Sequence, residues 1–592
     1  MSATDEVNAW LSNFGGALTR RNVGAALDCF TDDCYWRDLV AFSWNIATFE
    51  GHDSVRAMLE ARLPDVVPAA WTLEGEPTEA NGLIEAWLTF ETTVGRGRAH
   101  VRLRDGKAWT LFTTLEELAG FEERHGANRE LGVQLGATKE RVTWAQRRAR
   151  EREELGVAVQ PYVVIIGGGQ GGLGLGARLR RLGVPALIVE RNARAGDSWR
   201  NRYDSLTLHD PVWYDHMPYL PFPDHWPVYT PKDQMGDWLE AYATIMELNI
   251  WCSTECLSAR YDPEGGEWSV VVDREGERIV LRPRHLVLAT GMSGLPNMPD
   301  IPGADVFEGD VYHSSQYRTA APYRGKHAVI LGGNNSAHDI AQDLWEHDAA
   351  SITMVQRSGT TIVPGGRGGT GLYSQDAVDR GISADQADLI AASMPYALAA
   401  APAIENTKRL RAAEADFYAR LEAAGFLLDW GEDESGIGMK YARRGSGYYI
   451  DVGGSDLVIR GEVKLRTHVG IERLNQRSVT LTDHTELPAD LVVYATGYGS
   501  MNGWAAKLIS QDVADRVGKV WGLGSGTAYD PGPWEGELRN MWKPTQQPGL
   551  WFHGGNLAQS RLYSKYLALQ LKARFEGLPT PVYALPKVHH LK

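Results

Sequence analysis

Cysteine is scarce in this chain, and basic residues are outnumbered by acidic ones. Its 592 residues include four cysteines, which are too few for a disulfide framework, and no histidine cluster joins them at zinc-ligand spacing. A formal net charge of −15 argues against nucleic acid or an anionic membrane as the main partner. The sequence contains no run of about 18 apolar residues, so it predicts no membrane span. The N-terminus lacks the pattern of a signal peptide. We therefore expect a cytoplasmic protein without a metal site.

The first glycine-rich turn has the G-x-G-x-x-G spacing of a dinucleotide-binding fold. Gly167, Gly169 and Gly172 follow the apolar stretch "YVVII" and precede a helical pattern. One glycine permits the tight turn, one lets a pyrophosphate approach the backbone, and one lets helix and strand pack closely. A second strand, "PALIVE", ends in Glu190, where an acid can bind a ribose hydroxyl. An acid there disfavours a 2′-phosphate, so this turn predicts FAD or NAD.

A second turn, which begins at Gly332, repeats the pattern with substitutions. Asn334 stands where the second glycine is usual, and Asn335 and Ser336 follow it. The strand "HAVIL" precedes this turn, a helix follows, and the next strand ends in Arg357. A base at that strand end suits the 2′-phosphate of NADPH, because a guanidinium forms charge-assisted hydrogen bonds with phosphate. The alternative for Arg357 is a solvated surface cation.

Two dinucleotide sites in one chain have a direct chemical interpretation. NADPH at one site delivers a hydride to FAD at the other, which is the minimum apparatus of a flavin reductase. The sequence therefore predicts an α/β fold with two Rossmann-like domains, one for FAD and one for NADPH.

The segment between the turns carries a longer motif. Residues Phe307 to Arg318 form F-x-G-x-x-x-H-x-x-x-Y-R, with His313 and Tyr317 at fixed positions. Two A-T-G motifs, in "VLATGMSG" and "VVYATGYGS", lie before and after it. In this order the motifs resemble those of the class B flavoprotein monooxygenases, and the resemblance spans residues 160 to 592. Within that family, the Tyr-Arg ending is similar to the branch that oxygenates heteroatoms.

The resemblance implies a mechanism. NADPH reduces FAD, O₂ adds at the flavin C4a, and bound NADP⁺ shields the peroxide in a dry pocket. A neutral hydroperoxide oxygenates soft amines and thioethers, whereas a peroxide anion attacks carbonyls, and the sequence leaves open which form dominates. We expect one oxygen atom to enter a small organic substrate by N- or S-oxygenation or indole-type oxidation. Baeyer–Villiger oxidation of a ketone or oxidative decarboxylation of a 2-oxo acid is the alternative.

His209, in "YDSLTLHDP", is the side chain expected closest to the chemistry. The heteroatom-oxygenating branch has an asparagine at the matching position, whereas the indole-pyruvate monooxygenases look similar to this chain in having Leu-His there. His209 is therefore a candidate proton donor, with a packed histidine as the alternative. The resemblance makes His313, Tyr317 and Arg318 further candidate catalytic residues. His313 suits a structural or NADP-positioning role better than proton transfer.

The motifs and the resemblance together give the expected cofactor contacts. The segment "GDSWR" is similar to one that follows the first strand pair in many FAD enzymes. Near the end, "GGNLAQSRLY" predicts a helix whose N-terminus can stabilise negative charge on the reduced flavin. The expected contacts are Gly167, Gly169, Gly172, Glu190, Arg191, Ser198, Trp199, Thr230, Gln234, Ala289, Gly291, Gly332, Asn334, Asn335, Ser336, Arg357, Thr496, Gly497, Asn556 and Gln559.

The N-terminal segment has a different texture, with a helical opening and later alternating strands. It resembles the NTF2-like, or SnoaL-like, cone fold, in which Asp38 would be an inward acid or, more simply, a structural one. We expect a structural or assembly module in a homodimer. In order, the expected segments are an α+β domain (1–125), a linker with a charged helix (126–157), the first part of the FAD domain (158–325), the NADPH domain (326–485) with a helical insertion (about 370–445), and the rest of the FAD domain (486–592).

Two other classes of function were weighed. A flavoprotein that senses NADPH without oxygenating a substrate would not need the motif at 307–318. A disulfide reductase is disfavoured because Cys252 and Cys256 do not form a C-x-x-C pair. Trp534 and Trp542 are either pocket-lining or core residues.

Overall fold

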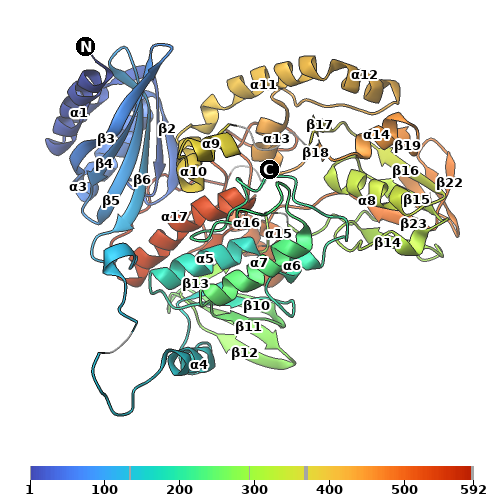
Figure 1. Cartoon of the computed structure of the whole chain (residues 1–592), viewed down its shortest axis with the longest axis horizontal. Coiled ribbons are helices and arrows are strands. Elements are labelled where there is room, and N and C mark those ends of the chain that lie inside the picture. The colour runs from blue at the N-terminus through green and yellow to red at the C-terminus, as the bar shows by residue number, and fades with distance from the viewer. Residues whose placement is uncertain (1, 133–134, 293, 366–370, 589–592) are drawn as a thin grey trace.

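The computed structural model describes residues 2–132, 135–292, 294–365 and 371–588. Figure 1 shows an N-terminal α+β domain at one side, a first nucleotide-binding domain at the centre and a second at the opposite side. The first residue of the expected insertion, residue 370, lies outside the described residues.

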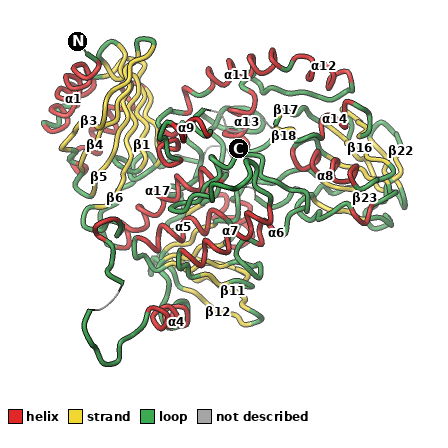
Figure 2. The backbone as a smooth tube through the Cα atoms, in the orientation of Figure 1, coloured by secondary structure: helices red, strands yellow, loops and turns green. Residues whose placement is uncertain are grey.

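The N-terminal domain is one curved sheet with helices against it (Figure 2). Its strand order is β2-β1-β6-β5-β4-β3, and the antiparallel pairs from β3 to β6 come from the alternating pattern of the sequence. Stacked aromatic rings, including Trp10 on Phe14 and Phe30 on Trp36, fill its core. The elements are α1 (Ala3–Thr19), α2 (Val23–Leu27), β1 (Phe30–Leu39), β2 (Ile46–Glu50), α3 (Gly51–Val66), β3 (Ala69–Ala80), β4 (Leu83–Glu91), β5 (Gly95–Arg104) and β6 (Lys107–Leu118). The likeness to the cone fold remains a prediction.

The linker contains η1 (Gly126–Asn128) and α4 (Trp144–Glu154). A capping box at Thr143 starts α4. The helix is not wholly solvated, because the buried Arg148 donates to the carbonyl oxygen of Glu247 at 2.7 Å and so docks it on the first nucleotide-binding domain.

The first nucleotide-binding domain is built on a parallel sheet with the order β24-β13-β7-β8-β9. Helices α5, α7 and α17 lie next to it (Figure 1). The elements are β7 (Val163–Ile166), α5 (Gln170–Arg181), β8 (Ala186–Val189), α6 (Asp197–Arg200), α7 (Lys232–Ile245), β9 (Ile250–Trp251), β13 (His285–Leu288), β24 (Leu550–Phe552) and α17 (Leu557–Phe575), with an antiparallel sheet of β10 (Thr254–Asp262), β11 (Glu267–Arg274) and β12 (Glu277–Leu281).

The second nucleotide-binding domain is built on a parallel sheet with the order β14-β23-β15-β16-β19. The prediction of two Rossmann-like domains is thus confirmed. The elements are β14 (Asp310–His313), η2 (Ala321–Tyr323), β15 (His327–Leu331), α8 (Asn335–Glu346), β16 (Ser351–Gln356), α14 (Gly454–Ile459), β19 (Val463–Thr467), β20 (Ile471–Leu474), β21 (Ser478–Leu481), β22 (Glu486–Pro488) and β23 (Leu491–Tyr494).

The expected domain boundaries need one correction. β14 and β23 pair with each other, and β23 also pairs with β15, so both belong to the second sheet. They lie outside the expected segment 326–485, one before it and one after it. Because β14 and β23 are distant in sequence, local motifs do not reveal that the two strands pair in one sheet.

The insertion is mostly helical, as expected, and arches over the two nucleotide-binding domains (Figure 1). Its elements are α9 (Gln375–Asp379), α10 (Ala384–Ala392), η3 (Tyr396–Leu398), α11 (Ala400–Ala413), α12 (Ala415–Ala423) and α13 (Gly436–Arg444). The paired strands β17 (Thr361–Pro364) and β18 (Tyr448–Asp451) flank it, and α15 (Asn502–Leu508) and α16 (Gln511–Val517) follow β23. Among the described residues no single helix is long and apolar enough to cross a membrane. The bent helix pair Ala384–Ala392 and Tyr396–Ala413 reaches the required length and apolar composition only when its two helices are taken together.

Candidate active site

The turn between β7 and α5 has the shape that a dinucleotide phosphate needs. Gly167 has a φ of +111°, and a Cβ there would lie 2.4 Å from the carbonyl oxygen of Ala289. A Cβ at Gly172 would lie 1.9 Å from the carbonyl oxygen of Gly167. Only glycine fits at either position. Gly169 is the N-cap of α5 and supplies no side-chain cap, so the helix end suits an anion.

Glu190 follows β8 and is buried beside this turn. Its Oε2 accepts a hydrogen bond from the backbone N–H of Gly168 at 2.6 Å, and its Oε1 accepts two from Asn192, at 2.8 and 2.7 Å. These bonds fix the carboxylate at the strand end, which is where a ribose hydroxyl would meet it.

Unpartnered polar atoms near the turn fit a bound FAD. The Thr290 hydroxyl and both ring nitrogens of His553 are buried without a hydrogen-bond partner among the described residues. Burial lowers the pKa of His553 to about 4, so its ring is neutral near pH 7. A Cβ at Gly171, in the first turn of α5, would lie 3.2 Å from that ring. Since buried polar atoms normally have partners, these atoms indicate that a polar ligand belongs here.

The second turn keeps the geometry at its first position and accommodates its substitutions at the others. Gly332 has a φ of +146°, and a Cβ there would lie 2.5 Å from the carbonyl oxygen of Ala495. Asn334 has an extended backbone, with φ −100° and ψ −169°, so glycine is not required. Its Oδ1 accepts a hydrogen bond from Thr360 at 3.1 Å. Ala337 is fully buried in the place of the third glycine, so α8 leaves room for a methyl group.

The other residues of the second turn have distinct surroundings. Arg357 is exposed just beyond the end of β16, which is the place expected for a 2′-phosphate contact. Asn335 accepts a hydrogen bond from the backbone N–H of Ile450 at 2.9 Å, so its side chain ties β18 to α8. Ser336 is half-buried in the first turn of α8. No side chain caps the N-terminus of α8, which leaves it suited to NADPH phosphates.

The residues of the motif at 307–318 lie in packing contacts. His313 Nε2 is 3.0 Å from the carbonyl oxygen of Gly497, and its Nδ1 is 2.9 Å from the Ser315 hydroxyl. Burial lowers the pKa of His313. The ring therefore joins β14 to the second A-T-G motif, which favours the structural interpretation. Tyr317 is buried and donates to Asp343 at 2.7 Å, and the exposed Arg318 donates to the carbonyl oxygen of Ser315 at 3.2 Å. The Tyr317 contact favours a structural role, and the catalytic role of Arg318 stays a prediction.

His209 lies where the two nucleotide-binding domains meet. It belongs to a loop of the first domain, and its Nε2 is 3.5 Å from Oδ2 of Asp339 on α8 of the second. Tyr203, on the same loop, donates to that oxygen at 2.5 Å. Burial lowers the pKa of His209, but Asp339 and, to a smaller extent, Asp210 raise it, and the net shift is upward. The position thus favours a protonated imidazole.

The N-terminus of α17 is held by a capping box between Asn556 and Gln559. Tyr441, on α13 of the insertion, donates to Gln559 Oε1 at 2.7 Å. The Asn556 amide donates to the hydroxyl of Tyr214, in the loop that contains His209, at 3.0 Å. The insertion and the loop therefore converge on a helix end that suits negative charge on a flavin ring.

The remaining expected contacts have varied surroundings. Trp199 donates to Gln170 at the start of α5 at 3.2 Å. Thr230 is fully buried, and its hydroxyl has no hydrogen-bond partner among the described residues. Thr496 donates to the carbonyl oxygen of Asn297 at 2.5 Å. Of the others, Arg191 and Ser198 are exposed, Gln234 is half-buried on α7, and Gly291 and Gly497 have φ values of +93° and +74°.

Several residues of this site were missed at the level of sequence. Asp339 is one, and its only signal was an acid on a helix just after a glycine-rich turn. Tyr203, Tyr214 and Tyr441 gave no local signal, because their partners lie in distant segments.

Asp38 has a structural environment in the N-terminal domain. The carboxylate is buried and accepts hydrogen bonds from the backbone N–H groups of Phe42 and Ser43 and from the hydroxyls of Ser43 and Thr113. Trp542 is also buried, stacks on Tyr563 and donates to the carbonyl oxygen of Gly554 at 3.2 Å. These contacts favour the packing alternative for both residues.

The contacts of Trp534 and of the cysteines support no direct role in the candidate site. Trp534 donates to Glu50 of the N-terminal domain at 2.6 Å, so it belongs to the contact between domains. Cys252 and Cys256 are free thiols, and burial raises the pKa of both, that of Cys256 to about 12. A thiol with so high a pKa is a poor nucleophile, which disfavours disulfide reduction.

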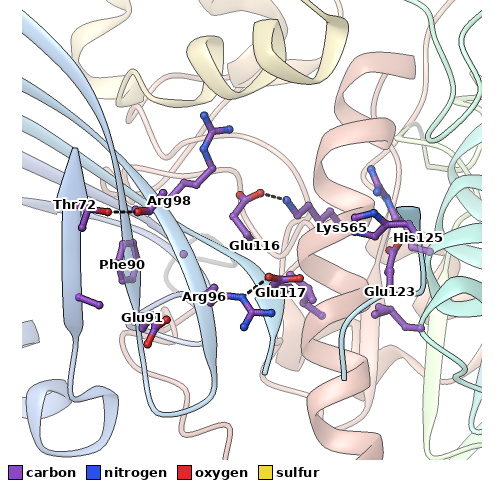
Figure 3. A pocket seen from close by; sticks show the side chains of 16 residues that line it. Thr72, Phe90, Glu91, Arg96, Arg98, Glu116, Glu117, Glu123, His125 and Lys565 are labelled. Atoms are coloured by element: carbon purple, nitrogen blue, oxygen red, sulfur yellow. Dashed lines mark hydrogen bonds and ion pairs between the residues drawn. The ribbon is translucent and has the colours of Figure 1, made fainter. Parts of the chain in front are cut away.

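A cavity of about 740 Å³ separates the N-terminal sheet from α5 and α17 (Figure 3). Several of its charged side chains already have partners: Arg96 pairs with Glu117, and Lys565 pairs with Glu116 at 2.5 Å. Its lining includes none of the residues of the two glycine-rich turns. The cavity is therefore a crevice between domains, separate from the candidate active site.

Parts of this chain are similar to known proteins. Residues 164–363 match the family described as pyridine nucleotide-disulphide oxidoreductase. The chain is 38% identical over 217 residues to indole-3-pyruvate monooxygenase YUCCA1 of Oryza sativa subsp. japonica, which covers 36% of this chain and 52% of that protein. It is 30% identical over 341 residues to probable indole-3-pyruvate monooxygenase YUCCA9 of Arabidopsis thaliana, with 57% of this chain and 75% of that protein covered.

Among solved structures, ε-caprolactone-bound cyclohexanone monooxygenase has a similar fold. The TM-score is 0.52 at 18% identity, over 70% of this chain and 88% of that one.

Of the two plant relatives, this chain spans about half the length of the rice protein and three quarters of the Arabidopsis protein.

Proposed function

The chain belongs to the class B flavoprotein monooxygenases, which are FAD- and NADPH-dependent, and we propose that it inserts one oxygen atom from O₂ into a small organic substrate. FAD, when bound, would accept a hydride from NADPH and activate O₂. The observation that carries the proposal is the meeting of the two domains at His209, where a loop of the FAD domain touches the helix that follows the NADPH turn.

Residues of this chain have separate tasks in the proposal. The first glycine-rich turn and Glu190 hold FAD, and the second turn and Arg357 bind the phosphates of NADPH, Arg357 at the 2′-phosphate. The N-terminus of α17 would stabilise negative charge on a reduced flavin bound beside it. Tyr214 and Tyr441 close over that helix end and exclude water.

His209 supports a choice among reaction types. Asp339 raises the pKa of His209 and so favours its protonated form, and a protonated imidazole can supply a proton, which favours electrophilic transfer of oxygen to an amine, a thioether or an indole ring. A second candidate is oxidative decarboxylation of a 2-oxo acid. It is supported by the Leu-His pair at 208–209 and by the similarity to plant proteins named as indole-3-pyruvate monooxygenases.

The test is coupled NADPH oxidation with a tertiary amine, a thioether, indole, a ketone and an aromatic 2-oxo acid. Products are identified by mass spectrometry under ¹⁸O₂, and H₂O₂ is measured in parallel. Label on nitrogen, sulfur or the indole ring supports the first candidate, and a labelled ester or decarboxylated acid supports the second. If every compound gives only stoichiometric H₂O₂ and no labelled product, the oxygenase proposal fails in favour of a non-oxygenating flavoprotein.

A further inference from the structure

One carboxylate joins the two nucleotide-binding domains beside His209. Asp339 lies on α8, the helix that begins at the NADPH turn, and its side chain is 7% exposed. Its Oδ2 accepts a hydrogen bond from Tyr203 at 2.5 Å and lies 3.5 Å from His209 Nε2. Both partners belong to one loop of the FAD domain, so a single oxygen atom sets the position of that loop against α8.

The other oxygen of Asp339 is also informative. Oδ1 is buried and has no hydrogen-bond partner among the described residues. A buried carboxylate with a spare acceptor is unfavourable unless a positive group stands near it. The His209 ring lies against the other oxygen, Oδ2, of the same carboxylate, so the contact stabilises the protonated ring rather than the neutral one.

We propose that Asp339 is a positioning residue that holds the His209 ring through Nε2 and leaves Nδ1 free to exchange a proton in the active site. Carboxylates orient imidazole rings in this way, because a bond to one ring nitrogen fixes the orientation and the proton of the other. The inference deepens the proposed function and rests on it. It also links the proton-exchanging ring, through Asp339, to the helix whose N-terminus forms the NADPH phosphate site.

Other charged groups act on the same ring. Arg202 and burial lower the pKa of His209, whereas Asp339 and Asp210 raise it, with Asp339 the larger of the two. Tyr203 donates its hydrogen bond to Asp339 and not to the His209 ring. Removal of the Asp339 charge therefore lowers the pKa of His209, and removal of the Tyr203 hydroxyl does not.

The first experiment follows the ring directly in the FAD-loaded protein. Histidine labelled with ¹³C at Cε1 is titrated by NMR, and His209→Asn identifies the His209 resonance. In Asp339→Asn the midpoint should fall by about one pH unit or more, since a neighbouring carboxylate shifts an imidazole by that order. In Tyr203→Phe the midpoint should stay or rise. An unchanged midpoint in Asp339→Asn overturns the proposal, and so does an equal fall in Tyr203→Phe, which would indicate general loosening of the loop.

The second experiment follows the reaction. With His209 as proton donor, the yield of oxygenated product per NADPH falls as pH rises through the pKa of the ring. Asp339→Asn should move this fall to lower pH by the same interval as the NMR midpoint, with FAD content unchanged. If no substrate is oxygenated but the NMR midpoint still shifts, the proposed function fails and the positioning contact stands. Oxygenation with an unshifted pH profile overturns the positioning role.

Discussion

Buried histidines make single residues sensitive to pH. Burial lowers the pKa of His285 to about 3, with smaller contributions from Arg574 and Arg284, and lowers the pKa of His216 to about 4. Each ring is neutral in the folded protein and becomes charged at mildly acidic pH only on unfolding. The stabilising contribution is therefore complete above the unfolded pKa of about 6.5, and it is lost as pH falls from there toward the folded pKa.

His285→Gln should make the protein less sensitive to acid. His285 accepts a hydrogen bond from Trp551 at 3.2 Å and lies 3.3 Å from the Tyr162 hydroxyl, and a glutamine amide keeps polar atoms there without titrating. Each such histidine adds a slope of up to about 1.4 kcal/mol per pH unit below pH 6.5. The loss of Tm between pH 7 and pH 4.5 should shrink in the variant. His484→Gln, at an exposed site, is the control, and an equal acid sensitivity in both variants would contradict the argument.

Arg357→Ala tests the expected discrimination between nicotinamide cofactors. Loss of the guanidinium removes a charge-assisted contact with the 2′-phosphate, which is worth about 1.5–3 kcal/mol. The KM for NADPH should rise about tenfold or more while the KM for NADH stays the same, as measured by steady-state oxidation of each. Arg477→Ala, at another exposed site of the second domain, should change neither value. Equal changes for NADPH and NADH would place the 2′-phosphate elsewhere.

At the scale of elements, the two strand–turn–helix units differ in how closely helix and turn approach. In α5 the backbone of Gly172 touches the turn, whereas α8 has space for the methyl group of Ala337. Each turn packs against one A-T-G segment. The carbonyl of Ala289 lies against Gly167, and the carbonyl of Ala495 lies against Gly332. The first unit therefore tolerates less change than the second.

Gly172→Ala should release FAD. The added Cβ would meet the backbone carbonyl of Gly167, which cannot move without opening the turn, and overpacking of this kind costs about 1–3 kcal/mol or more. The flavin absorbance per polypeptide should drop severely. Gly503→Ala is the matched control, because Gly503 also lies in a helix and its new Cβ would make only ordinary contacts at 3.9 Å or more. Full flavin content in Gly172→Ala would show that α5 can shift.

At the scale of the whole molecule, the N-terminal domain is joined to the flavin region through buried polar contacts. Arg37, on β1, forms two hydrogen bonds with Glu537 at 2.6 and 2.8 Å, and both side chains are 3% exposed. The same guanidinium donates to Tyr563 on α17 and to the carbonyl oxygen of Ala392 on α10. Since α17 also carries Asn556 and Gln559 at its start, one helix contacts the N-terminal domain and the flavin site.

Arg37→Ala should weaken the whole assembly. It leaves Glu537 buried without its partner, and breaking a buried ion pair in this way costs about 3–5 kcal/mol. Thermal unfolding should occur at lower temperature, with earlier proteolysis near residue 125. The double variant Arg37→Ala/Glu537→Gln should recover part of the loss, because the unpaired charge is gone. Arg324→Ala, in an exposed pair with Asp348, should change stability by only about 0–1 kcal/mol. If Arg37→Ala lowered stability by as little as Arg324→Ala, the N-terminal domain would be held to the rest of the protein by other contacts.

Local patterns carried much of the prediction. The two glycine-rich turns, the strands around them and the acid and base at Glu190 and Arg357 follow from spacing alone, because a turn against a phosphate restricts its backbone within a few residues. The order of motifs gave the family. The helical insertion and the mixed N-terminal domain were also visible as changes of periodicity.

Only the tertiary structure decided which distant residues share a site. The pairing of β14 with β23, the contact of His209 with Asp339, and the meeting of Tyr214 and Tyr441 at α17 each join segments more than 100 residues apart. Tyr317 and His313 likewise acquired packing roles only once their partners Asp343 and Gly497 were in place. The physical reason is that burial and charge belong to the surroundings of a side chain in space, whereas backbone spacing belongs to the chain itself.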